Sequence, residues 1–208
     1  MLIICFGDSL TAGFQSPTKD NPQGRPTPYG EWIQEFLGPT GVVRTSGVCG
    51  EVTGEMVLRF RRDVLAHRPN FVVILGGTND LGWNAAPEAI MGNLISLYEQ
   101  TRAAGSVPIP VTVPSIRVEQ SGGSPDGDAW IADHIARRGR LNGLIHGYAQ
   151  SKQLAWIDLF GATAEPSGRQ LAAEYSNDGL HLSTAGYRLL AELVVRQALT
   201  PAMTRETN

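Results

Sequence analysis

Short apolar runs recur along the chain, separated by segments whose apolar residues return at helical spacing. Most runs are continuous rather than alternating, which is typical of strands covered on both faces of a sheet. In residues 87–104, Ile90, Leu94 and Leu97 recur at helical spacing, and Pro87 suits a first helical turn. Strands are predicted at residues 2–6, 42–44, 71–75, 107–113 and 154–157. Helices are predicted at about residues 29–37, 53–67, 87–104, 126–150 and 183–199.

The alternation of strands and helices predicts a parallel sheet with right-handed crossovers, in an α/β domain of three layers, α/β/α. Residues 1–199 read as one domain, because no internal repeat or linker divides them, and residues 200–208 read as a frayed tail. Three long connections are rich in Pro, Gly and polar residues: 15–28, 115–127 and 161–177. Connections of this length are usually functional or disordered.

Polar segments follow the predicted strands. In open α/β sheets, ligands bind outside the carboxyl ends of the strands. We therefore expect these segments to lie at one rim of the sheet. They are GDSL (7–10) after the first strand, SGVCG (46–50) after the second, GGTND (76–80) after the third, and NDGLH (177–181) beyond the fifth.

Ser9, Asp178 and His181 have the side chains that acyl transfer by serine needs: a nucleophile, a base and a group that orients the base. Taken alone, Ser9 is more simply a helix cap, and Asp178 with Gly179 a turn. The flanking residues also exclude the G-x-S-x-G nucleophile elbow.

Asn79 and Gly50 are candidate donors to a developing oxyanion. Asn79 follows two glycines and could offer its side-chain amide, although asparagine is also a common turn residue. Gly50 could offer a bare backbone N–H, or simply permit a positive φ. Loss of one such donor typically costs about 2.7–4 kcal/mol of barrier, so both residues are worth testing.

Composition excludes several other classes. The chain has 208 residues, 42% hydrophobic and 18% charged, with a net charge of −3. At a pI of about 5.8 it has no electrostatic footprint for nucleic acid or an anionic membrane. No apolar run is long enough for an integral membrane segment, and two cysteines make no disulfide framework. No signal peptide is visible, so we expect a cytoplasmic protein, although a secreted chain trimmed of its leader would look the same.

Motifs for metals and cofactors are missing from the sequence. It contains no Walker A motif, no G-x-G-x-x-G after a strand, no H-E-x-x-H and no C-x-x-C, so we expect neither metal nor cofactor. Because the net charge is negative, the arginine clusters are expected to be solvated helix faces. These clusters are Arg59, Arg61 and Arg62, and Arg137, Arg138 and Arg140.

Together these motifs resemble the GDSL family, also called SGNH hydrolases. Gly7-Asp8-Ser9-Leu10 resembles its first block, Gly50 its second-block glycine, Gly77-Thr78-Asn79-Asp80 its third block, and Asp178-Gly179-Leu180-His181 its fifth. The resemblance implies a flavodoxin-like sheet of five parallel strands in the order 2-1-3-4-5. It implies Ser9 as nucleophile, His181 as base and Asp178 as its orienter. It also implies an oxyanion hole from the Ser9 N–H, the Gly50 N–H and the Asn79 side chain. Many members carry an asparagine shortly before the second-block glycine, where this chain has Arg44-Thr45-Ser46-Gly47, so Gly47 remains an alternative to Gly50.

The resulting hypothesis is a hydrolase of small-molecule carboxylic esters or thioesters that works through an acyl-enzyme. An acyltransferase, or a catalytically silent module that binds carbohydrate or ester on the same fold, stays open as an alternative. Candidates for a substrate wall are Trp83 and, in the connection 15–28, Pro17 and Pro28, with that connection acting as a flap. Each could equally be a surface or core residue, and the sequence gives no prediction of acyl group, leaving group or oligomeric state.

Overall fold

A parallel sheet of four strands forms the centre of the computed structural model, which describes residues 1–19, 21–118, 125–167 and 169–206. The strand order is β2-β1-β3-β4. β1 and β3 lie inside the sheet, and every residue of β3 is buried, as its continuous apolar run predicts. The edge strand β2 is half exposed. The strands are β1 (Leu2–Gly7), β2 (Val42–Gly47), β3 (Phe71–Leu75) and β4 (Val107–Pro110).

The prediction of five strands in the order 2-1-3-4-5 is wrong for the described residues. The run 154–157 contributes only one isolated parallel bridge, between Ile157 and Val111. The reason lies in the neighbouring helices. The backbone N–H of Leu154 donates to the carbonyl of Ala149 and so completes the end of α6 (Pro125–Ser151), while Asp158 already caps α7 (Leu159–Thr163). Too little chain remains between them for a strand.

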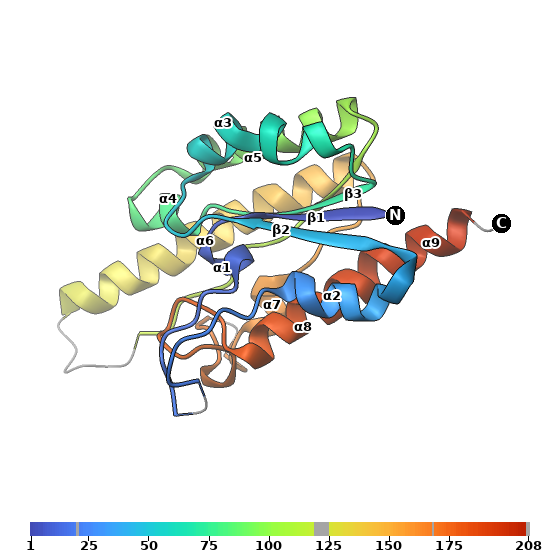
Figure 1. Cartoon of the computed structure of the whole chain (residues 1–208). Coiled ribbons are helices and arrows are strands. Elements are labelled where there is room, and N and C mark those ends of the chain that lie inside the picture. Colours follow the sequence, from blue (N-terminus) through green and yellow to red (C-terminus); the bar gives the residue numbers. More distant parts are fainter. Residues whose placement is uncertain (20, 119–124, 168, 207–208) are drawn as a thin grey trace.

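Helices cover both faces of the sheet, which gives the three predicted layers (Figure 1). Ile4 and Phe6 of β1 pack with α3, α5 and α6, while Ile3 and Cys5 face the opposite way and pack with α2, α7 and α8. This alternation of one strand between two cores explains why the run is continuously apolar. The longer helices are α2 (Tyr29–Leu37), α3 (Thr53–Asp63), α5 (Pro87–Ala103), α6 (Pro125–Ser151) and α8 (Thr184–Val194). The shorter ones are α1 (Ser9–Ala12), α4 (Thr78–Gly82), α7 (Leu159–Thr163) and the 3-10 turns Gly38–Thr40, Leu65–His67 and Ala173–Tyr175.

The carboxyl-terminal segment is helical where a frayed tail was expected. α8 continues through a π-helical turn, Val195–Leu199, into α9 (Thr200–Glu206). Ala202 and Met203 of α9 pack against the core. Residues 207–208 lie outside the described residues. Across the described chain, no helix combines the length and apolar character required to cross a bilayer.

Candidate active site

Ser9 is the first residue of α1, and only Asp8 separates it from the end of β1. Asp8 caps this helix, because its Oδ1 accepts a hydrogen bond from the backbone N–H of Leu10 at 2.9 Å. The strand therefore ends and the helix begins within one residue, which holds Ser9 at the rim of the sheet. Oγ of Ser9 lies 3.1 Å from Nε2 of His181. Two residues that are far apart in the sequence are thus in hydrogen-bond contact.

Asp178 and His181 belong to one turn, in which the carboxylate holds both the backbone and the ring of the histidine. Oδ1 of Asp178 accepts hydrogen bonds from the backbone N–H groups of Leu180 at 2.9 Å and of His181 at 2.7 Å. Oδ2 lies 2.8 Å from Nδ1 of His181. An ionised carboxylate can only accept, so Nδ1 carries the proton and Nε2 is left as the acceptor that faces Ser9.

Ser16 is a further partner of this turn. Its Oγ donates to Oδ2 of Asp178 at 2.6 Å. Burial alone would raise the pKa of Asp178, but the hydrogen bonds from Ser16, from the His181 ring and from the two backbone N–H groups outweigh it and lower the pKa from 3.8 to about 2. Asp178 is therefore ionised at neutral pH. Sequence reasoning missed Ser16, because no motif marks a serine in this loop.

The residues after α1 are anchored to the loop before α8. The Phe14 ring lies with its centroid 4.5 Å from that of the His181 ring. Gln15 is buried, accepts a hydrogen bond from Asn177 at 3.1 Å and donates one to Thr184 at 2.9 Å. The first part of the predicted flap is therefore fixed to the elements that carry His181, which also places Ser16 beside Asp178.

The candidate oxyanion donors lie on neighbouring loops. Gly50 is exposed with a φ of +80°, a conformation that favours glycine. The backbone N–H groups of Gly50 and Ser9 donate to no residue within the described chain. Nδ2 of Asn79 donates to the carbonyl of Glu51 at 2.9 Å, which holds the amide beside the Gly50 loop and leaves its second N–H available. Each of these three residues therefore has an N–H that no described residue accepts.

Gly47 has a different role. It ends β2, and a Cβ at this position would lie 2.2 Å from the backbone nitrogen of Ala12. Only glycine lets α1 pack this closely on the strand. A Cβ on Gly50 would meet nothing within 4 Å. Of the two candidate glycines, packing accounts for Gly47, which favours Gly50 as the donor.

A buried ion pair lies under these loops. Arg59 of α3 is 9% exposed. Its Nε and Nη2 each donate a hydrogen bond of 2.6 Å to one carboxylate oxygen of Glu51. It also donates to the carbonyl of Gly7 at 2.9 Å and to Oγ of Ser46 at 2.7 Å. The expectation of a solvated arginine is wrong for Arg59, because it joins the ends of β1 and β2. Asp80 similarly accepts hydrogen bonds from the backbone and hydroxyl of Thr53.

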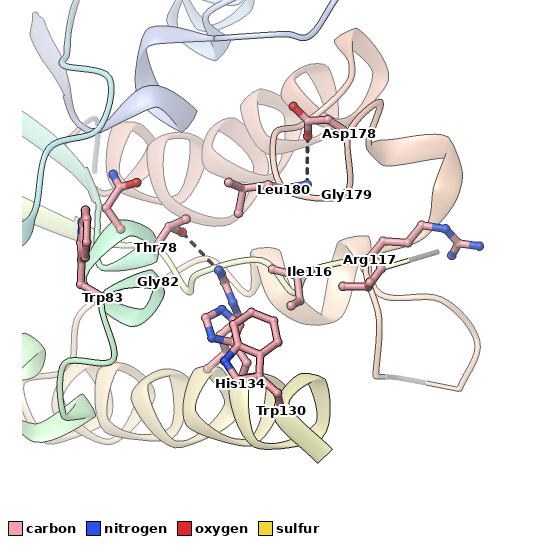
Figure 2. Close-up of a pocket in the computed structure, with 13 residues that line it drawn as sticks. Thr78, Gly82, Trp83, Ile116, Arg117, Trp130, His134, Asp178, Gly179 and Leu180 are labelled. Carbon is pink, nitrogen blue, oxygen red and sulfur yellow. Dashed lines mark hydrogen bonds between the residues drawn. The ribbon is translucent and has the colours of Figure 1, made fainter. Parts of the chain in front are cut away.

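A cavity of about 470 Å³ opens beside Asn79 and the Asp178 turn (Figure 2). Trp83 of α4 stands at one side of it, and Trp130 of α6 stacks on His134 with ring centroids 5.0 Å apart. Of the three candidates for a substrate wall, Trp83 lines this cavity, whereas Pro17 and Pro28 are outside the set of described lining residues. Pro17 is exposed and Pro28 precedes α2. The cavity is lined by Thr78, Asn79, Gly82, Trp83, Ile116, Arg117, Val118, Trp130, His134, Arg138, Asp178, Gly179 and Leu180.

Arg138 is a second buried arginine, so the expectation that it is solvated is also wrong. It is 1% exposed, and its Nη1 donates to the carbonyl of Pro114 at 2.8 Å. Burial lowers the pKa of its guanidinium to about 10, against the attraction of Asp8. Asp8 is fully buried, and burial raises its pKa from 3.8 to about 7. One sequence signal could have found Arg138: Trp130, His134 and Arg138 are spaced by four, which places them on one side of α6.

A comparison with protein families identifies one that matches most of the chain. Residues 5–189 match the model of the GDSL-like lipase/acylhydrolase family. An uncharacterised lipoprotein of Bacillus subtilis, YqeF, is 28% identical over 120 residues, which cover 53% of this chain and 47% of that protein. The chain thus matches about half the length of this relative.

Solved structures show the same fold. A GDSL-like lipase from Bacteroides thetaiotaomicron superposes with a TM-score of 0.72 at 23% identity, over 94% of this chain and 86% of that one. An acetylxylan esterase from Geobacillus stearothermophilus gives a TM-score of 0.73 at 20% identity, over 94% of this chain and 92% of that one. At such identities, the likeness concerns the fold alone.

Proposed function

Since the chain belongs to the GDSL-like lipase/acylhydrolase family, we propose that it hydrolyses carboxylic esters or thioesters through an acyl-enzyme formed on Ser9. The contact that carries this proposal is the 3.1 Å separation of Ser9 Oγ and His181 Nε2. A nucleophile and a base at this distance, with the base oriented by a third group, are the arrangement that acyl transfer requires.

In the proposed reaction, Ser9 Oγ attacks the carbonyl carbon while His181 Nε2 takes its proton. The oxygen of the tetrahedral intermediate accepts hydrogen bonds from the Ser9 N–H, the Gly50 N–H and Nδ2 of Asn79. His181 then gives its proton to the leaving alcohol or thiol, and the acyl group remains on Ser9. A water molecule deprotonated by His181 then attacks the acyl carbon. The bond between this carbon and Ser9 Oγ breaks, His181 returns the proton to Oγ, and the acid is released.

Asp178 acts through His181 in this scheme. Its hydrogen bond to Nδ1 selects the tautomer with an unprotonated Nε2, and its charge stabilises the imidazolium that forms during attack. The lowered pKa of Asp178 supports the role, because the carboxylate keeps its charge at the pH of the reaction.

The test is Ser9→Ala, assayed with a series of p-nitrophenyl esters of increasing acyl length. We expect kcat to fall by about 10⁴-fold or more with the fold unchanged. Ser151→Ala, at an exposed serine at the end of α6, is the matched control and keeps full activity. Turnover by Ser9→Ala at the wild-type rate would refute the proposal. An active-site phosphonate should add covalently to Ser9, and no labelling with any leaving group would instead favour a binding module.

Hydrolysis and transfer share the same acyl-enzyme, so they differ only in what attacks it. Product analysis with an added alcohol or sugar acceptor separates them. We expect the free acid to dominate at millimolar acceptor. Mainly acylated acceptor would make the protein a transferase and leave the roles of Ser9, His181 and Asp178 unchanged.

A further inference from the structure

The cavity beside Asn79 has two buried nitrogen-bearing side chains that the proposed reaction does not use, Arg138 and His134. Both come from α6. The apolar part of the lining is formed by Trp83, Ile116, Val118, Trp130 and Leu180. The cavity therefore combines apolar walls with a few buried polar groups, which is the usual make-up of a small-molecule site.

Arg138 has hydrogen-bonding capacity left over. Its Nη1 donates to the carbonyl of Pro114 and contacts Oγ1 of Thr78 at 3.5 Å. Its Nε is buried without a hydrogen-bond partner, and Nη2 donates to no residue in the described part of the chain. Asp8 attracts the guanidinium through space, but no hydrogen bond joins the two. A buried arginine with unsatisfied donors is costly unless something else accepts them, and its paired N–H groups suit an oxyacid anion.

His134 adds a second donor. Its Nδ1 lies 3.2 Å from Nη2 of Arg137, and because arginine can only donate, Nδ1 must be the acceptor. Burial lowers the pKa of His134 to about 4, helped by the charges of Arg138 and Arg137, so the ring is neutral at pH 7. The proton of a neutral ring is then on Nε2, which donates to no described residue.

The other charged groups of the lining are already paired. Both oxygens of Asp178 accept hydrogen bonds, from Ser16 and from the turn that contains His181. Arg117 lies 3.6 Å from Glu165, and its guanidinium points away from the cavity in Figure 2. Among the described lining side chains, the unsatisfied groups are therefore donors, and one of them is a cation. A bound group that supplies acceptors and negative charge would complete this set.

We propose that this cavity binds one side of the ester substrate, and that this side carries an anionic oxyacid group, carboxylate or phosphate, on an apolar body. Arg138 and His134 hold the anion, while Trp130, Trp83 and Leu180 contact the body. Asn79, the candidate oxyanion donor, and Asp178, the partner of His181, line the same cavity, so the ester carbonyl would sit on this side of it. The inference rests on the proposed function for this placement, but the anion site itself can be tested without turnover.

The binding test uses Ser9→Ala protein and calorimetry. The probes are 4-acetoxybenzoate, its neutral isostere 4-acetoxybenzamide, and 4-acetoxyphenyl phosphate for the phosphate alternative. We expect at least one anion to bind about tenfold or more tightly than the amide, the usual effect of a hydrogen bond to a charged group. Adding Arg138→Gln should abolish this preference and leave the affinity for the amide within about twofold. Arg140→Gln, an exposed neighbour on α6, is the matched control and should keep the preference.

Equal affinity for all three probes, or no measurable binding of any, would overturn the inference even if Arg138→Gln does not fold, because this comparison needs only Ser9→Ala. If Arg138→Gln folds and retains the anion preference, the inference is also overturned. Kinetics separate the two proposals. Wild-type enzyme that hydrolyses the amide and the benzoate equally well keeps the proposed function and refutes the anion site. An anion preference in binding with no turnover of any ester keeps the anion site and refutes the proposed function.

Discussion

Replacing Asp8 by asparagine tests whether burial of this carboxyl group affects the stability of the whole protein. Asp8 is fully buried, and its Oδ2 has no hydrogen-bond partner. Burial raises its pKa from 3.8 to about 7, with opposing contributions from the Leu10 N–H and from Arg138. The folded protein therefore binds this proton more tightly than the unfolded chain does.

The sign of the pH effect follows from this difference. Below pH 3.8 the Asp8 carboxyl is protonated in both the folded and the unfolded state, so it does not make the free energy of unfolding depend on pH. Between pH 4 and 7 unfolding releases the proton, so the stability falls as the pH rises, and the loss is complete above pH 7. The shift from 3.8 to about 7 corresponds to about 4 kcal/mol at 1.36 kcal/mol per pKa unit.

Asp8→Asn removes the titration and can keep the cap, because its amide oxygen can still accept from Leu10. We expect the free energy of unfolding of the variant, minus that of the wild type, to rise by about 1.4 kcal/mol per pH unit between pH 5 and 7. Urea unfolding at pH 5, 6, 7 and 8 measures this difference, and Asp128→Asn at an exposed site of α6 is the control. A difference that does not change with pH would refute the reasoning, whatever its absolute value.

Three further predictions concern single contacts of the site. Ser16→Ala should lower kcat/KM by about 3–10-fold, because Asp178 loses one charged hydrogen bond and keeps its other donors. An unchanged kcat/KM would show that the 2.6 Å contact between Ser16 and Asp178 has no kinetic role. Asn79→Ala should lower kcat by about 10²–10³-fold with little change in KM, and an equal loss through KM alone would argue against an oxyanion donor. Gly47→Ala should lower the free energy of unfolding by about 3 kcal/mol, since its Cβ would lie 2.2 Å from Ala12, whereas Gly50→Ala should lose only about 1 kcal/mol in urea unfolding.

The sequence predicts those strands and helices whose own burial determines their pattern of apolar residues. β1 and β3 are buried on both faces, so their runs are continuously apolar, and the helix at Pro87–Ala103 shows its buried side at helical spacing. The run 154–157 is equally apolar but is divided between the end of α6 and the cap of α7. Periodicity cannot reveal that outcome, because it depends on where two neighbouring helices end.

The residues of the site likewise divide into those that the sequence predicts and those that it does not. Ser9, Asn79, Asp178 and His181 could be proposed because each sits in a short motif directly after an element of the sheet or before a helix. Ser16 could not, because no motif marks it and only its hydrogen bond to Asp178 connects it to the site. Arg59 and Arg138 were expected in solvent because the net charge of the chain is negative. Several of their partners are backbone carbonyls, which leave no trace in a sequence.

These two arginines explain how four loops hold one geometry. Arg59 reaches from α3 to the last carbonyl of β1 and to Ser46 at the end of β2. Arg138 reaches from α6 to Pro114, beyond β4, and to Thr78, which precedes Asn79. Each guanidinium thus joins backbone segments that follow different strands, and a charge with several fixed donors is well suited to that task. The helices on one face of the sheet therefore set the relative positions of Ser9 and Asn79, and Arg138 contributes to that support and to the lining of the cavity beside it. Arg138→Lys keeps the positive charge but loses the planar set of N–H donors. We therefore expect this variant to lose more free energy of anion binding, measured by calorimetry, than free energy of unfolding, measured in urea.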